Sequence, residues 1–185
     1  MINKRLFWPL LVWLNMSLAL LPVKAAEPGY SDGMVRAAVI FGILRFAEWP
    51  EILSTQEKVV LCAVGQSPAV EAIGSLKTLP RIGQVVVEYR GALSPSQLRG
   101  CQAVIMGRRT GSQLPLAPSA LLICDECDPA AHGVAAINLM QLDNRIQFEV
   151  NLDRVREQKV NLSASLLELA ARCSSRGTEV RGCND

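Results

Sequence analysis

Short, continuous runs of apolar residues are the feature that most constrains the fold of this chain. The clearest runs are residues 59–64, 85–87, 103–106 and 120–123. They do not alternate with polar residues, which is typical of strands covered on both faces in a parallel sheet. Helix-start signals separate them, namely Ser67-Pro68, Asp128-Pro129 and a capping box from Ser94 to Gln97. Strand, capped helix, strand is the pattern of α/β folds.

Residues 30–50 predict a long first helix. Asp32 is the expected N-cap, and Pro50 is the expected end, because the residue before a proline avoids the helical region. Every residue from 37 to 44 is apolar or glycine, so the helix has no clean polar face. Such a helix is either buried on all sides or lies in a contact with another subunit or protein.

The C-terminal part predicts an antiparallel hairpin. Residues 146–150 alternate between apolar and polar, which indicates a strand with one face exposed to solvent. A turn at 142–145 joins them to the apolar run 134–141. The predicted fold is a three-layer α/β/α sandwich with a mostly parallel sheet and an antiparallel edge hairpin near the C-terminus.

Two helices are expected after the hairpin, at residues 152–158 and 163–173. The second has an expected buried stripe of Leu162, Leu166, Leu169 and Ala170. The polar tail from 174 to 185 requires a covalent staple to be ordered.

The first 25 residues predict a secretory signal peptide. A basic start at Lys4-Arg5 precedes an apolar run from Leu6 to Leu21, and Val23 and Ala25 fit a cleavage site. The alternative is a retained membrane anchor, but the run of about sixteen residues is shorter than the roughly 20 that a spanning helix needs. We therefore expect export to the periplasm and a single α/β domain over residues 26–185.

Charge argues against a nucleic-acid-binding protein. Removal of the expected signal peptide takes away three of the 19 basic residues, which leaves 16 Lys and Arg side chains against 17 Asp and Glu. A near-neutral chain without a basic run lacks the electrostatic footprint of nucleic-acid binding. The sequence shows no internal repeat or long linker, in line with one domain.

The six cysteines all follow the expected signal peptide: Cys62, Cys101, Cys124, Cys127, Cys173 and Cys183. An even number in an exported chain indicates disulfides. Cys62 lies inside the first expected strand and Cys101 just before the third, and these strands can be neighbours. A Cys62–Cys101 bridge would be worth about 3–4 kcal/mol in the chain-entropy model. A Cys173–Cys183 bridge would hold the tail. No metal or cofactor site is expected, since a second C-x-x-C or a histidine pair is missing.

The motif Cys124-Asp125-Glu126-Cys127 raises an alternative, thiol–disulfide oxidoreductase chemistry. Such a site needs a helix N-terminus that favours the first thiolate. The helix start at Asp128 is half of that geometry, but the two carboxylates between the thiols disfavour a thiolate. A local structural or regulatory disulfide is the main interpretation, and free thiols or other pairings are a third.

Several single residues have both a functional and a structural interpretation. Trp49, Phe148 and Glu149 are candidate partner-binding residues, because tryptophan is enriched in hot spots and an edge strand can accept a partner strand. Their alternative role is packing against the sheet. His132 is expected to be a surface residue rather than a catalytic base. Residues 65–68 form either an anion cradle at a helix start or an ordinary connection.

Two segments resemble the YfiR-like family of exported bacterial proteins. The first, residues 35–50, starts with Ala37-Ala38 after Val35-Arg36 and ends with Glu48-Trp49-Pro50, which is similar to the opening pattern of that family. The second runs from residue 136 through Arg145-Ile146-Gln147-Phe148-Glu149-Val150 to residue 170. The family usually carries a lysine where Arg36 stands, and the Cys124–Cys127 pair is not part of its broad pattern.

The resemblance implies a periplasmic repressor that is not an enzyme and is often a homodimer. Its implied partner is the periplasmic domain of an inner-membrane diguanylate cyclase, whose cyclic-di-GMP output it holds down. An OmpA-like outer-membrane lipoprotein is implied to sequester the repressor. Two other function classes are a thiol–disulfide oxidoreductase using Cys124 and Cys127, and a sensor that binds a small ligand in the crevice at the carboxyl ends of the strands.

Overall fold

The computed structural model describes residues 31–49, 58–91, 93–109, 119–175, 178–180 and 183. The expected signal peptide, residues 1–25, lies outside the described residues. Within the described part of the chain, no helix has the length and apolar character needed to cross a membrane.

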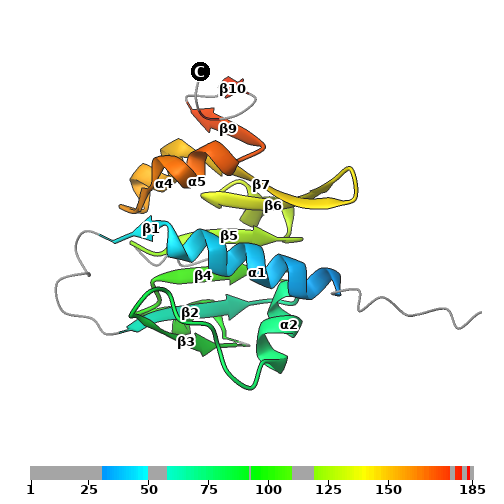
Figure 1. The fold of residues 1–185 in the computed structure, drawn as a ribbon, viewed down its shortest axis with the longest axis vertical. Coiled ribbons are helices and arrows are strands. Elements are labelled where there is room, and N and C mark those ends of the chain that lie inside the picture. The colour runs from blue at the N-terminus through cyan, green and yellow to red at the C-terminus, as the bar shows by residue number, and fades with distance from the viewer. Residues whose placement is uncertain are drawn as a thin grey trace, which may run out of the picture.

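The described residues form an eight-stranded sheet (Figure 1). From one edge to the other its strands are β10 (Thr178–Val180), β9 (Arg172–Ser175), β7 (Arg145–Asn151), β6 (Ile137–Leu142), β5 (Leu121–Asp125), β4 (Ala103–Met106), β2 (Lys58–Val64) and β3 (Val86–Arg90). The strands from β6 to β3 are mutually parallel, whereas β7 is antiparallel to β6. The predicted α/β class and the mostly parallel sheet are confirmed.

The predicted hairpin is formed by β6 and β7. Its two turn residues, Asp143 and Asn144, have φ angles of 49° and 58°, as in the type I′ turn that matches the twist of the strands. The hairpin lies near the edge of the sheet rather than at it, because β9 pairs with β7 and β10 pairs with β9. The Cys173–Cys183 disulfide ties Cys183 to β9 in this part of the sheet.

Helix α1 (Asp32–Arg45) begins with a different cap from the one expected. Ser31 is the N-cap, since its hydroxyl oxygen accepts a hydrogen bond from the backbone N–H of Met34 at 3.3 Å. Asp32 instead lies in the first turn, where the helix dipole favours a carboxylate.

The first helix also ends earlier than predicted, at Arg45 and not at Pro50. The residues that follow form β1 (Ala47–Glu48), which pairs with β8 (Asn161–Leu162) in a separate two-stranded sheet. Pairing with a distant segment therefore overrides the local pattern, because an apolar run by itself does not distinguish a buried helix from a buried strand.

The remaining helices are α2 (Pro68–Ser75), the 3₁₀ helix η1 (Pro95–Gln97), α3 (Pro129–His132), α4 (Leu152–Glu157) and α5 (Ala164–Leu169). Ser67 is the N-cap of α2 and Asp128 that of α3, as predicted. The Gln97 side chain accepts a hydrogen bond from the backbone N–H of Ser94 at 2.9 Å, as the capping box requires.

The last helix is shorter than the predicted span of 163–173, because the backbone turns extended at Ala170 and then enters β9. The predicted buried stripe is correct for Leu166 and Ala170, which are 2% and 6% exposed. It is wrong for Leu169, which is 68% exposed, since the helical periodicity stops at that residue.

Two apolar cores lie on opposite faces of the sheet. The larger core lies between the sheet and helices α1, α2, α4 and α5, and receives strand residues such as Leu61 and Ile105. Figure 1 shows α1 crossing this face of the sheet, with α2 beside it. The smaller core, on the other face, packs against short segments around η1 and α3 and includes the Cys62–Cys101 disulfide. Within the described residues, one face of the sheet is therefore covered by four helices, and the other face by short segments.

Two glycines of α1 test how closely it packs on α2. A Cβ atom at Gly33 would lie 2.4 Å from the carbonyl oxygen of Pro68, whereas a Cβ at Gly42 would meet nothing within 4 Å. We expect Gly33→Ala to lower the free energy of unfolding by about 1–3 kcal/mol, because the helices must separate. Gly42→Ala, in the same helix, should raise it by up to ~1 kcal/mol, since alanine is the better helix former. Urea denaturation measures both free energies of unfolding. Equal changes in the two variants would contradict the close packing of α1 on α2 at Gly33.

Candidate functional site

Charged side chains gather at the carboxyl ends of β4 and β5, beside the first turn of α1. Arg36 is 3% exposed, and its Nε contacts Asp32 Oδ2 at 2.6 Å while its Nη1 contacts Asp125 Oδ1 at 2.7 Å. Its Nη2 lies 3.3 Å from Glu126 Oε1. The other carboxylate oxygen of Glu126 pairs with Arg108, which follows β4. We call these five residues the charged cluster.

The contact between Arg36 and Asp125 is buried on both sides, since Asp125 is fully buried. Burial alone would lower the pKa of Arg36, but its hydrogen bonds to Asp32 and Asp125 outweigh burial and raise that pKa above the ordinary value. The side chain therefore stays charged. Only the planar, five-donor guanidinium suits simultaneous contact with three carboxylates, because a lysine ammonium is a point charge.

Asp125 also connects β5 to α2. Its Oδ2 atom accepts a hydrogen bond from the backbone N–H of Ala69 at 3.0 Å. The next two backbone N–H groups, of Val70 and Glu71, donate to the side-chain and backbone oxygens of Ser67. Pro68 has no backbone N–H group. The first turn of α2 thus has no N–H left for an external anion. This favours the interpretation of residues 65–68 as an ordinary connection rather than an anion cradle.

The Cys124–Cys127 disulfide closes the turn that presents Asp125 and Glu126. Glu126 has a φ of 55°, a left-handed conformation that is uncommon for a non-glycine residue. Cys124 is 3% exposed, whereas a catalytic dithiol needs an accessible thiolate. The arrangement favours a structural disulfide that holds the charged cluster, and gives no support to the oxidoreductase alternative.

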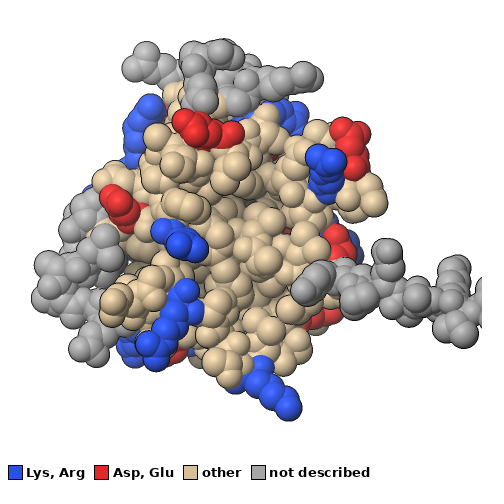
Figure 2. Space-filling view, in the orientation of Figure 1, with Lys and Arg blue, Asp and Glu red and all other residues tan. Residues whose placement is uncertain are grey.

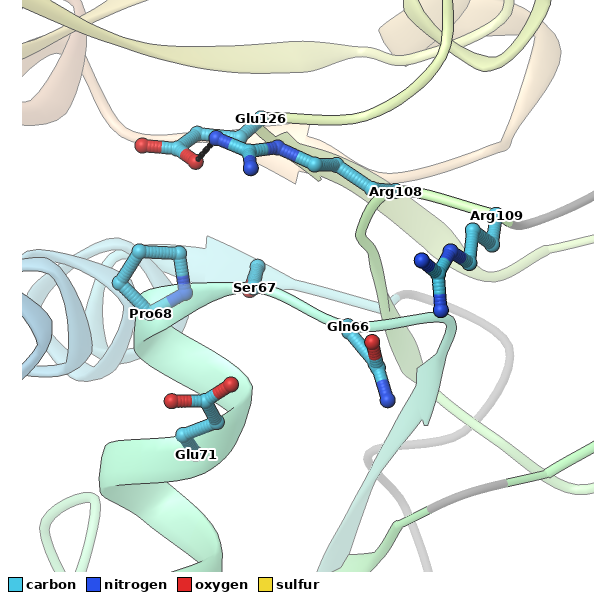
Figure 3. Close-up of a pocket in the computed structure, with 7 residues that line it drawn as sticks. All are labelled: Gln66, Ser67, Pro68, Glu71, Arg108, Arg109 and Glu126. Atoms are coloured by element: carbon cyan, nitrogen blue, oxygen red, sulfur yellow. Dashed lines mark hydrogen bonds and ion pairs between the residues drawn. The ribbon is translucent and has the colours of Figure 1, made fainter.

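A crevice of about 420 Å³ opens beside the charged cluster (Figure 3). Its lining comes from the ends of β2, β4 and β5 and from the first turn of α2: Gln66, Ser67, Pro68, Glu71, Arg108, Arg109 and Glu126. Strands β2 and β4 are neighbours in the sheet. From β2 the chain continues to β3 on one side, and from β4 it continues to β5 on the opposite side, so the direction in which strands are added reverses between β2 and β4. Open α/β sheets bind ligands at such a switch point.

The floor of this crevice is rigid. The backbones of Gln66 and Arg108 exchange two hydrogen bonds, of 3.0 and 2.8 Å. A Cβ at Gly107 would lie 2.3 Å from the carbonyl oxygen of Gln66, so the close approach requires glycine. The side chains of Arg109 and Glu71 make no hydrogen bond or ion pair within the described residues, and Figure 3 shows them at opposite ends of the lining.

The predicted partner-binding residues are not presented together. Trp49 and Phe148 are 3% and 7% exposed and belong to the larger core, which favours the structural alternative for these two side chains. Their partner-binding role stays a prediction. Glu149 points to the other face of the sheet, where it pairs with Arg172 and is 16% exposed. Its binding role stays a prediction. His132 is exposed at the end of α3.

The charged cluster carries no sequence motif, yet a signal for it exists. Arg36 is the single charged residue within 35–44, and Asp125 ends an apolar strand run. A lone charge in an apolar segment predicts a buried ion pair, because an unpaired buried charge is too costly. For the crevice residues Arg109 and Glu71 no comparable signal exists, since each lies at an ordinary surface position of the sequence.

The sequence model of the YfiR/HmsC-like family matches residues 34–171. The chain belongs to this family. The matched region extends from within α1 to the residue before β9 and includes the buried Arg36–Asp125 contact and the crevice. Membership of a regulatory family supports a regulatory role in the periplasm for the chain. Among curated proteins, none matches the chain.

Two carboxylates on the same guanidinium form a matched test of the charged cluster. Asp125→Asn removes the fully buried charge opposite Arg36, and we expect it to lower the free energy of unfolding by about 3–5 kcal/mol. Asp32→Asn alters a side chain that is 48% exposed, and we expect a loss below ~1 kcal/mol. Chemical denaturation measures both values. Equal losses in the free energy of unfolding would show that the buried Arg36–Asp125 contact stabilises the fold no more than the exposed Arg36–Asp32 contact does.

Proposed function

We propose that the chain is a periplasmic negative regulator that binds the periplasmic domain of an inner-membrane diguanylate cyclase. Binding lowers cyclic-di-GMP signalling and, through it, biofilm formation. The observation that carries this proposal is the match to the YfiR/HmsC-like family over residues 34–171. The three disulfides support the periplasmic part, because disulfides persist in that oxidising compartment and are rare in the cytosol.

Such a regulator acts by occupancy, without turning over a substrate. It shifts the cyclase only by the difference between its affinities for the active and the inactive state. Roughly 3 kcal/mol of preference for the inactive state corresponds to about hundredfold repression. A rigid binding surface serves this purpose, and the charged cluster, which ties α1 and α2 to β5, supports rigidity.

Two further parts of the proposal concern release. An OmpA-like outer-membrane lipoprotein relieves repression by sequestering the regulator. The disulfides make the regulator sensitive to reduction: loss of the Cys124–Cys127 bond frees the turn that holds Asp125 and Glu126, and so loosens the contact of β5 with Arg36 of α1.

Repression in cells tests the proposal directly. The full chain, expressed with a diguanylate cyclase that has a periplasmic domain, is expected to lower cellular cyclic-di-GMP by tenfold or more. Two matched variants are a chain without residues 1–25, which stays in the cytosol, and a chain with all six cysteines replaced by serine. Both are expected to leave cyclic-di-GMP high.

Each outcome of this experiment bears on a different part. Unchanged cyclic-di-GMP with the full chain contradicts the regulator function. Repression by the chain without residues 1–25 contradicts action from the periplasm. Normal repression by the all-serine variant contradicts the role of the disulfides.

A second candidate function is a sensor for a small polar molecule, favoured by the crevice at the switch point. Its lining is polar and offers two side chains of opposite charge, Arg109 and Glu71, that have no partner within the described residues. A ligand that meets both would carry charged groups of its own. Because Glu126 contributes to both the crevice and the charged cluster, a ligand there would act next to α1.

A thermal-shift screen of small charged metabolites on the oxidised chain tests this candidate. A ligand of the crevice is expected to raise the melting temperature of the chain, and Arg109→Gln or Glu71→Gln should abolish the rise because each removes a charge of the lining. Lys77→Gln, an exposed position outside the lining, is the control. A rise that persists in both crevice variants would exclude this site.

A further inference from the structure

The outward face of α1 is apolar in its middle, and no described helix or strand covers it. It consists of Asp32, Val35, Ala38, Val39, Gly42 and Arg45, all exposed or half-exposed, which we call the outer stripe. Val35 is 39% exposed. Figure 2 shows the strip over α1 as largely free of charged atoms. A helix apolar on all sides belongs either in a core or in an interface, and only one side of α1 is in the core.

The outer stripe is symmetric about a point between Ala38 and Val39. Counting outward from this point pairs Ala38 with Val39, Val35 with Gly42, and Asp32 with Arg45. A two-fold rotation about the point would lay a second α1 antiparallel on the first, with each residue opposite its mate. Valine then faces a small residue, and an acid faces a base. An isologous contact needs this self-complementarity.

We propose that a second copy of this chain docks on the outer stripe, with the two α1 helices antiparallel. The inference rests on the proposed function and deepens it, by naming a surface for the homodimer that the family resemblance implies. The charge pattern suits a second copy, because the acidic first turn and the basic last turn of α1 complement each other when the helix meets itself in reverse.

The terminal charges are available for this contact. Asp32 uses its Oδ2 atom for Arg36, and its side chain is 48% exposed. Arg45 is exposed and makes no ion pair within the described residues. In the antiparallel arrangement each Asp32 meets the partner's Arg45, which gives two symmetric ion pairs at the rim of the contact.

The middle of the stripe has room for the partner. No atom lies within 4 Å of a Cβ built at Gly42, so the partner's Val35 can occupy that space. Small residues at Ala38 and Gly42 permit an interaxial distance near the short end of the usual range of about 8–10 Å.

The size of the contact sets the expected affinity. The helix has 14 residues, and at about 1.5 Å per residue it spans roughly 21 Å. One helix from each copy lies at or below the low end of stable interfaces, which bury about 1,200–2,000 Å² in total. We therefore expect a reversible dimer with a dissociation constant in the micromolar range.

Sedimentation analysis of the oxidised exported chain over a concentration series tests the proposal. The wild type is expected to pass from monomer to dimer. Gly42→Leu fills the space for the partner's Val35 and should weaken the dimer at least tenfold, while remaining helix-compatible. Gly74→Leu, at an exposed glycine of α2, is the control and should dimerise as the wild type does. Arg45→Glu should weaken the dimer, more at low salt, and Arg45→Lys should retain it.

Repression measured on the same variants separates this proposal from the proposed function. A wild type that stays monomeric at every concentration overturns the outer-stripe dimer. So does a dimer that Gly42→Leu leaves unchanged, since it then uses another surface. If the monomeric wild type represses and Gly42→Leu does not, the stripe binds the cyclase instead, which overturns the dimer and leaves the regulator function intact. Far-ultraviolet circular dichroism confirms that each variant is folded.

Discussion

The arrangement of this fold depends on the contact between Arg36 of α1 and Asp125 at the end of β5. The first helix of the described chain thereby meets the fifth strand, and the same carboxylate reaches the first turn of α2 through Ala69. A buried ion pair adds little stability compared with an apolar pair of similar volume, but removal of one partner is costly. We infer that the contact mainly fixes where α1 lies on the sheet. In that position Gly33 of α1 closely approaches the backbone of Pro68 in α2.

The disulfides compensate for the unequal cover of the two sheet faces. Helices α1 and α2 bury the larger core, while the smaller core has only short segments over it. Two of the three disulfides, Cys62–Cys101 and Cys124–Cys127, belong to that thinly covered side. Cross-links restrict the unfolded chain and so stabilise a domain whose core is limited on one side. An oxidising compartment is therefore part of the physical basis of the fold, in agreement with the proposed periplasmic location.

Local chemistry explains which elements were predictable from the sequence. The strands with continuous apolar runs and the caps at Ser67 and Asp128 follow from patterns a few residues long, and the structure contains them. The ends of α1 and α5 were not predictable in this way, because β1 and β9 form through pairing with distant segments. The expected Cys62–Cys101 pair matched the structure because the neighbouring strands β2 and β4 bring these cysteines together.

The candidate site was less predictable for the same physical reason. Arg36 gave a signal as a lone charge in an apolar helix, but its three carboxylate partners come from two separate segments. The burial of Trp49 and Phe148 likewise depends on tertiary packing, so residue type alone suggested binding surfaces that the structure places in the core.

Direct binding tests the central claim, that the chain acts by occupying another protein. Isothermal titration of the oxidised, purified chain into the isolated periplasmic domain of the cyclase should give saturable binding with a defined stoichiometry. Abolition of that binding by prior reduction of the chain would agree with the dependence on disulfides. The absence of any saturable binding at concentrations well above those in the periplasm would contradict the account.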